Sequence, residues 1–187
     1  MLIGFGFLYT LLRRYAWSGV SYNYIITVLA IQWACLLIGF WANVNRRRLQ
    51  ADKAQPITFP SVLLNMDVLV NADYTVATVL ISFGAVIGRM SALQCVVMTF
   101  FEVIFATANV QIGLELGVTD PGGSMFIHTF GAAFGLAVAY MVGDYAHKGK
   151  GNGEAKLGTS RVAGTTAMIG TLFLFCFWPS FNAALLT

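Results

Sequence analysis

The sequence predicts an all-α membrane protein with about six transmembrane helices, the first of them truncated. Two observations support this prediction. Hydrophobic residues make up 58% of the 187 residues and charged residues only 10%, whereas an average soluble domain carries about 25% charged residues. The few charges also divide the chain into apolar segments, most of them near the length of about 20 residues that a helix needs to span a bilayer.

The apolar segments follow one another along residues 1–187 and predict a single membrane domain. They cover roughly residues 1–12, 21–42, 70–88, 93–114, 122–142 and 162–182. The first is shorter than the length of about 20 residues that spans a bilayer, and the last runs to Thr187 without a polar tail. We therefore expect a domain that is incomplete at both ends; a short natural chain is the alternative.

Two polar segments separate predicted helices. Residues 45–60 contain three arginines and two prolines and indicate a connector, and residues 143–160 are rich in glycine and lysine, as is typical of a flexible loop. The loops after the first, third and fifth apolar segments carry seven lysines and arginines, against four on the opposite side. The positive-inside rule therefore places these three loops in the cytoplasm. Asp120 then lies on the outer side of the membrane.

The fifth apolar segment begins with a helix-start signal and contains a histidine. Asp120 is a good N-cap, and Pro121 suits the first helical position, where no backbone N–H is needed. His128 lies eight residues beyond Asp120, which corresponds to about 12 Å along a helix. We therefore expect the imidazole near the middle third of a hydrocarbon core that is about 30 Å thick.

The face of this helix that carries His128 also carries Gly131 and Gly135. Small residues on one face usually indicate close helix packing, and His128 would then be a buried residue bonded to a neighbouring helix. Ionisable groups inside a membrane, however, usually face a cavity or a partner. We favour a pore-lining histidine over a structural one.

Glu102, in the fourth apolar segment, is the other charge within the membrane. A structural hydrogen bond and a functional role are both open for it. The sequence contains no HExxH motif, no cysteine spacing typical of a metal site and no convergent Ser/His or paired-carboxylate arrangement. We therefore expect neither an enzyme nor a metal or cofactor site.

Four stretches resemble one known family. "AIQWACLL", "NADYTVATVLISFGAVIGR", "DPGGSMFIHTFGAAFGL" and "AMIGTLFLFCFWPSFNAA" are similar to the Rhesus glycoprotein branch of the ammonium transporter (Amt/Rh) family. The resemblance covers nearly the whole chain, in order. In this family, eleven or twelve helices form two inverted repeats, and the proteins assemble as trimers with one pore per subunit. The resemblance implies that this chain corresponds to the first repeat plus one helix of the second.

The resemblance also assigns roles to four residues. His128 matches the first of the family's two pore histidines, and Asp120 matches an aspartate associated with ammonium recruitment. Phe181 matches one of two stacked phenylalanines of the outer gate. The position of the other gate phenylalanine is Tyr74 here, which adds a hydroxyl to the constriction.

The resemblance implies a Rhesus-type ammonia/ammonium channel with an outer gate and a histidine-lined pore. The expected surroundings are the lipid bilayer, in a multi-pass protein of the plasma membrane that assembles as a homo- or heterotrimer and binds no nucleic acid. Two alternatives stay open, a non-conducting Rhesus-like subunit or truncated product, and a channel for carbon dioxide. The second pore histidine would lie beyond this chain.

Overall fold

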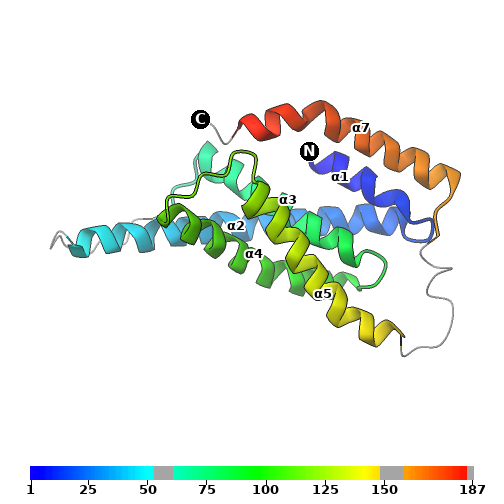
Figure 1. Cartoon of the computed structure of the whole chain (residues 1–187), viewed down its shortest axis with the longest axis horizontal. Coiled ribbons are helices and arrows are strands. Elements are labelled where there is room, and N and C mark those ends of the chain that lie inside the picture. Colours follow the sequence, from blue (N-terminus) through cyan, green and yellow to red (C-terminus); the bar gives the residue numbers. More distant parts are fainter. Residues whose placement is uncertain (53–60, 148–157, 185–187) are drawn as a thin grey trace.

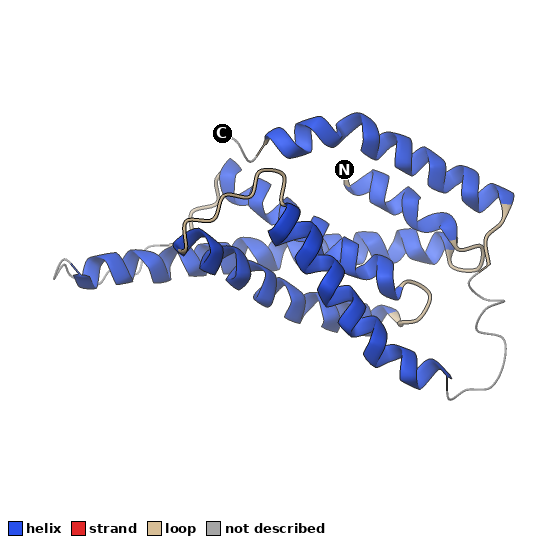
Figure 2. Ribbon diagram, in the orientation of Figure 1, coloured by secondary structure: helices blue, strands red, loops and turns tan. Residues whose placement is uncertain are grey.

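The structure is a computed structural model that describes residues 1–52, 61–147 and 158–184. These ranges contain helices and no strand (Figure 2). The described helices that are long and apolar enough to cross a membrane are Ala16–Arg48, Met66–Val86, Ala92–Glu115, Ser124–Gly143 and Arg161–Ala183. With the short apolar helix Leu2–Leu11 before them, they confirm the predicted all-α membrane fold.

The short amino-terminal helix α1 (Leu2–Leu8) continues as one 3₁₀ turn, η1 (Tyr9–Leu11). Helix α1 lies alongside α7 (Arg161–Ala183), far away in the sequence (Figure 1). A Cβ atom on Gly170 would lie 2.4 Å from the backbone nitrogen of Leu8. Glycine therefore allows the two backbones to approach closely, as small residues do in membrane helix pairs.

Helix α2 (Ala16–Asp52) is 37 residues long and extends beyond the predicted segment 21–42 at both ends. The connector predicted for residues 45–60 is therefore wrong for residues 45–52, which belong to α2. Arginine, leucine, glutamine and alanine are strong helix formers, so the polar sequence continues the helix. Arg48 also forms an ion pair with Glu115, with 3.0 Å between Nη1 and Oε2.

The central helix is α3 (Met66–Val86), which packs between α2 and α5. In its most apolar 18-residue window, 56% of the residues are buried, the largest share among the candidate spans described. The Asn65 side chain caps it by accepting a hydrogen bond from the Val68 backbone nitrogen at 2.9 Å. Helix α4 (Ala92–Glu115) begins with a capping box.

A π-helical stretch, η2 (Ser124–Thr129), leads into helix α5 (Phe130–His147). Helix α5 crosses α3 on one side of the bundle, whereas α7 packs against α1. Only 17% of the residues in the most apolar window of each of the spans Ser124–Gly143 and Arg161–Ala183 are buried. Both helices therefore present broad apolar faces that the described part of the chain leaves uncovered.

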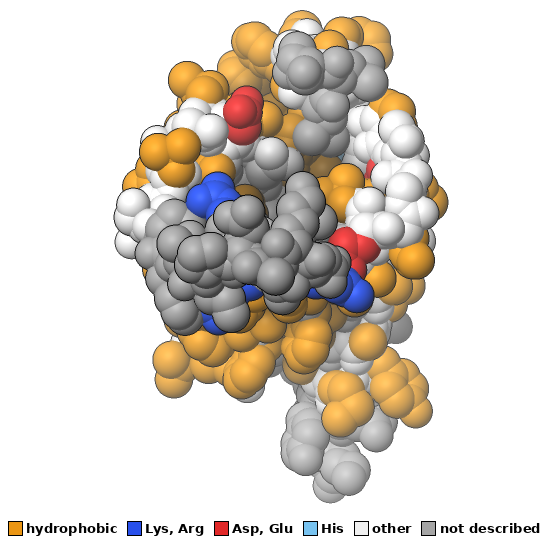
Figure 3. All heavy atoms as spheres, turned by 90° about the vertical axis from the view of Figure 1, so that its left-hand side faces the viewer, with side chains coloured by type: hydrophobic (Ala, Val, Ile, Leu, Met, Phe, Trp, Pro, Cys, Tyr) orange, Lys and Arg blue, Asp and Glu red, His pale blue; other side chains and the backbone are white. Residues whose placement is uncertain are grey.

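Polar and apolar side chains are segregated on the surface. Figure 3 views the molecule from the end at which α2 terminates, where basic and acidic side chains lie, and hydrophobic side chains cover the flanks. The ion pair between Arg48 and Glu115 belongs to this polar end, since Glu115 is the last residue of α4. Apolar flanks with charges at the ends are typical of a bundle whose helices cross a bilayer.

Candidate functional site

Tyr74, the ninth of the 21 residues of α3, meets Phe181 near the carboxyl end of α7. Their ring centroids are 4.6 Å apart with an interplanar angle of 59°, and the Tyr74 hydroxyl donates a hydrogen bond to the Phe181 carbonyl oxygen. Phe181 lies in the last turn of α7, where backbone carbonyls lack partners within the helix. The tyrosine hydroxyl thus ties α3 to the end of α7.

Trp178 joins this aromatic pair to His128. It stacks on Phe181 with 5.3 Å between the ring centroids and an angle of 24°. The imidazole of His128 lies 5.4 Å from the Trp178 ring and 6.4 Å from the Phe181 ring, measured between centroids. We call Tyr74, Phe181, Trp178 and His128 the aromatic cluster. The structure therefore brings together Tyr74, Phe181 and His128, three of the site residues expected from the sequence. Trp178 contacts both Phe181 and His128.

Trp178 was not identified as a site residue from the sequence. It precedes Phe181 by three residues, so the two rings share one face of α7. This spacing is a signal that could have identified Trp178. It is a weak signal, because aromatic residues at helical spacing are common in membrane spans.

His128 lies in the π-helical stretch η2, and its backbone nitrogen bonds to the Gly123 carbonyl oxygen at 3.0 Å, five residues earlier. Its ring is half-buried. Among the described residues, its buried Nε2 atom has no hydrogen-bond partner. A π-helical turn is rare and often occurs at a functional site, and a buried polar atom without a partner needs an explanation.

Asp120 caps η2, although not in the predicted geometry. Its Oδ2 atom accepts hydrogen bonds from the backbone nitrogens of Met125 and Phe126, both at 2.8 Å. The prediction that Pro121 begins the helix is wrong, because the helix begins at Ser124. The intervening residues form a turn that contains two glycines with positive φ angles, 79° at Gly122 and 75° at Gly123.

The turn after Asp120 lies close to the aromatic cluster. A Cβ atom on Gly122 would come within 2.8 Å of Oδ1 of Asn182, the neighbour of Phe181. Asp120 itself binds the backbone of η2 rather than an aromatic ring. Its position relative to the cluster therefore depends on this turn and on the contact with Asn182.

The glycine face of α5 packs against α3. A Cβ atom on Gly131 would lie 2.7 Å from the Thr78 carbonyl oxygen, and one on Gly135 would lie 2.7 Å from the Cα atom of Ser82. The close packing that small residues indicated is therefore found at Gly131 and Gly135, but His128, expected on the same helix face, contacts a different neighbour. The π-helical stretch changes the residue-per-turn spacing between His128 and α5, so the imidazole contacts α7 while the glycines contact α3.

Tyr74 lines two cavities. One has a volume of about 190 Å³ and lies among α2, α3, α4 and η2. The other, of about 490 Å³, lies between α1, α3 and α7, and Phe181 also lines it. Because Tyr74 lines both cavities, a movement of its ring would change the shape of both.

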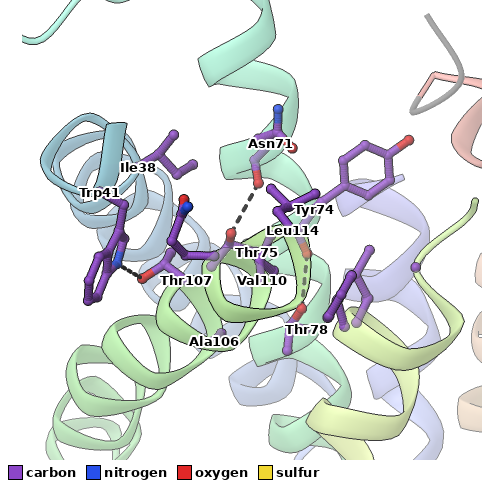
Figure 4. Close-up of a pocket in the computed structure, with 14 residues that line it drawn as sticks. Ile38, Trp41, Asn71, Tyr74, Thr75, Thr78, Ala106, Thr107, Val110 and Leu114 are labelled. Carbon is purple, nitrogen blue, oxygen red and sulfur yellow. Dashed lines mark hydrogen bonds between the residues drawn. The ribbon is translucent and has the colours of Figure 1, made fainter. Parts of the chain in front are cut away.

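The smaller cavity is lined by neutral polar and apolar side chains (Figure 4). Thr75 and Thr78 lie along its α3 side, and each hydroxyl donates to a backbone carbonyl oxygen four residues earlier. On the opposite side, Trp41 Nε1 donates to Thr107 Oγ1 at 3.3 Å. No acidic or basic side chain lines this cavity among the residues described, so it offers hydrogen bonds and no formal charge.

Glu102 of α4 lies inside the helix bundle. Its side chain is fully buried, and its Oε1 atom is hydrogen-bonded to the Ser82 hydroxyl of α3. Of the two roles that the sequence left open, the structure therefore supplies a structural contact between α4 and α3. In residues 1–52, 61–147 and 158–184, no three side chains of His, Cys, Asp or Glu form a group that could hold a metal ion.

Comparison with known proteins identifies the family. The family model described as the Ammonium Transporter Family matches residues 1–187. The chain is 40% identical over 185 residues to the ammonium transporter Rh type C of Xenopus tropicalis, covering 98% of this chain and 36% of the relative. It is 39% identical over 186 residues to the human protein of the same name, covering 99% of this chain and 36% of that protein.

A solved structure agrees with this result. The structure titled "Nitrosomonas europaea Rh50 and mechanism of conduction by Rhesus protein family of channels" superimposes with a TM-score of 0.76 at 28% sequence identity, covering 98% of this chain and 45% of that one. The chain spans about a third of the length of the curated relatives it matches. The whole length of the chain nevertheless matches one family, and this is a family of transporters and not of enzymes. The chain is a multi-pass integral membrane protein that belongs to the Ammonium Transporter Family.

Proposed function

We propose that this chain forms part of a Rhesus-type ammonia/ammonium channel, with Tyr74 and Phe181 as an outer gate and His128 on the path. The observation that carries the proposal is the aromatic cluster, which leads from the gate pair through Trp178 to the imidazole. The relatives named ammonium transporters support the substrate. We further propose a trimer in the plasma membrane, as the family resemblance implies.

His128 can select a small neutral molecule by hydrogen bonding. A neutral imidazole has one donor nitrogen and one acceptor nitrogen, and the Nε2 atom meets no partner among the described residues. Ammonia could bond there as it passes. A bare cation would lose its hydration shell among aromatic rings, at a cost of many kcal/mol. The path therefore favours ammonia over ammonium at this depth.

Asp120 would act at the entrance, before the gate. A carboxylate near the outer face attracts cations electrostatically, and its Oδ2 atom also caps η2. In this proposal ammonium gathers near Asp120, leaves its proton outside and continues as ammonia past Tyr74 and Phe181. The cap keeps the carboxylate fixed relative to the helix that carries His128.

A flux experiment tests this function. The complete protein that carries this sequence is reconstituted in vesicles, and the internal pH is followed after an ammonium pulse. His128→Ala should lower the ammonia flux at equal protein content. Met141→Ala is the matched control, because Met141 lies in the span Ser124–Gly143 and is 66% exposed. Equal flux in the parental protein and His128→Ala would remove His128 from the path.

A non-conducting subunit is the second candidate. The observation that favours it is the small buried share of the spans Ser124–Gly143 and Arg161–Ala183, 17% of the most apolar window of each. A path next to these helices needs further protein to close it. The same flux experiment separates the two candidates, because a structural subunit would give no flux above empty vesicles.

A further inference from the structure

We propose that Glu102 is a protonated carboxylic acid that donates a hydrogen bond to Ser82 and so positions α5, the helix that follows His128. The link runs through three helices, from Glu102 of α4 to Ser82 of α3 and on to the Gly131 carbonyl oxygen of α5. The consequence for flux rests on the proposed function, whereas the protonation of Glu102 does not.

Among the described residues, Glu102 has no charged partner. It lies near the middle of α4 and has a relative exposure of 0%. The other glutamate of α4, Glu115, pairs with Arg48 at the helix end. Within the described ranges, no basic side chain forms an ion pair with Glu102. The nearby Tyr9 hydroxyl of η1 donates to the Leu80 carbonyl oxygen instead, so Ser82 is the hydrogen-bond partner of this carboxyl group.

The hydrogen atoms can be counted at Ser82. Its hydroxyl has a single hydrogen, but its Oγ atom lies within hydrogen-bonding distance of Glu102 Oε1, of the Gly131 carbonyl oxygen at 2.8 Å and, at the longer distance of 3.5 Å, of the Thr78 carbonyl oxygen. A carbonyl oxygen can only accept. If the serine hydrogen goes to Gly131, the contact with Glu102 requires a hydrogen from the carboxyl group. A protonated Glu102 supplies it and satisfies both contacts.

An ionised Glu102 fits this environment poorly. A carboxylate can only accept hydrogen bonds, and the one donor available to it would be the Ser82 hydrogen, which Gly131 would then lose. Within the part of the chain that the structure describes, the Oε2 atom is buried without a hydrogen-bond partner. Burying a charge without a partner is far more costly than burying a neutral polar group. With the proton on Oε1, Oε2 is a neutral carbonyl oxygen.

The same chain of hydrogen bonds fixes the position of α5. Gly131 follows His128 by three residues, and the close contact of Gly131 and Gly135 with α3 brings the Gly131 carbonyl oxygen to Ser82. Glu102 holds the serine from the opposite side. Removing the Glu102 donor would free the serine hydroxyl to turn away from Gly131. The register between α3, with Tyr74, and α5 would then be less well defined.

Infrared spectroscopy of the complete protein in lipid vesicles at neutral pH tests the protonation. A protonated carboxyl group has a carbonyl stretching band distinct from the bands of a carboxylate. Glu102→Gln should remove one protonated-carboxyl band, whereas the control Glu115→Gln, in the same helix, should remove only carboxylate bands. Loss of carboxylate bands alone in Glu102→Gln would overturn the proposal.

Ser82→Ala provides a second test if Glu102→Gln fails to fold. It should keep the protonated-carboxyl band but shift its frequency, because the acid loses its acceptor. A band with unchanged frequency, or no such band in the parental protein, would contradict the proposal. His128→Ala should leave the band in place, so failure of the proposed function is distinguishable from failure of this inference.

The positioning role has its own readout, the ammonia flux. Glu102→Gln should keep flux near the parental value, because an amide N–H can donate to Ser82. Glu102→Leu, of similar size but without a donor, should lower flux several-fold at equal protein content. Equal flux in the two variants would overturn the positioning role and leave only the protonation.

Discussion

The Tyr74 hydroxyl donates its hydrogen to the backbone carbonyl oxygen of Phe181, so Tyr74 is held to Phe181 by a hydrogen bond to its backbone as well as by contact between the two rings. A phenylalanine at position 74 could keep the ring contact but not this bond. The gate proposed for this chain is therefore tied to the end of α7.

Tyr74→Phe should separate the two interactions. We expect a loss of about 1 kcal/mol of stability, the usual net value of one hydrogen bond, and a flux equal to or higher than the parental value, because the ring can move more freely. Thermal unfolding in detergent and the vesicle assay measure the two effects. Tyr24→Phe is the control, since Tyr24 is 44% exposed on α2. A fall in flux in Tyr74→Phe would contradict the idea that this hydrogen bond restrains opening of the gate.

Gly131→Ala should destabilise the protein by about 1–3 kcal/mol, the usual cost of overpacking a close contact. The new Cβ atom would lie 2.7 Å from the Thr78 carbonyl oxygen, so α5 would have to move away from α3. Gly143→Ala in the same helix is the control, because no atom lies within 4 Å of its Cβ position. That control should be neutral or stabilising, by about 0.5–1 kcal/mol. Equal unfolding midpoints in the two variants would contradict close packing at Gly131.

Asp120 can be tested separately as a cap and as a charge. Asp120→Asn keeps an oxygen that can accept from Met125 and Phe126, so stability should change little while the negative charge is lost. Asp120→Ala should lose about 1 kcal/mol, as is usual for a lost cap. If the charge recruits ammonium, flux at low ammonium should fall in both variants. Unchanged flux in a stable Asp120→Asn protein would leave the cap as the function of this residue.

Residues 1–187 expressed alone should show no ammonia flux above empty vesicles. Inverted-repeat transporters bind substrate at the interface between two halves, and the spans that carry His128 and Phe181 are only 17% buried in their most apolar windows. Polar groups beside the cluster would face lipid, at a cost of several kcal/mol each. Flux that depends on His128 would show that this chain, alone or as an assembly of copies, can close a path.

The helices could be predicted from the sequence because hydropathy and helix capping are local properties. The span Arg161–Ala183, for example, differs from the predicted segment 162–182 by one residue at each end. The extension of α2 to Asp52 was missed, since part of its support is the contact of Arg48 with Glu115, a residue far away in the sequence.

The site could be predicted only in part. The proximity of Tyr74 and Phe181 followed from the family resemblance, whereas the place of Trp178 between Phe181 and His128 did not. The late helix start after Asp120 depends on a glycine turn whose positive φ angles the N-cap rule did not consider. The bond between Ser82 and Glu102 joins residues of different helices, and hydropathy carries no information about such pairs.

The length of α2 determines how the protein can fit a bilayer of a given thickness. Its 37 residues correspond to about 55 Å, because each helical residue adds about 1.5 Å, whereas a bilayer with its headgroups is about 40–45 Å thick. The helix must therefore tilt or project into water beyond the headgroups. Charges are costly among acyl chains. The ion pair of Arg48 with Glu115 therefore favours a position of these helices in which the pair lies at the level of the headgroups or in water. Hydrophobic mismatch in a thinner or thicker bilayer would then be met by tilting of the bundle.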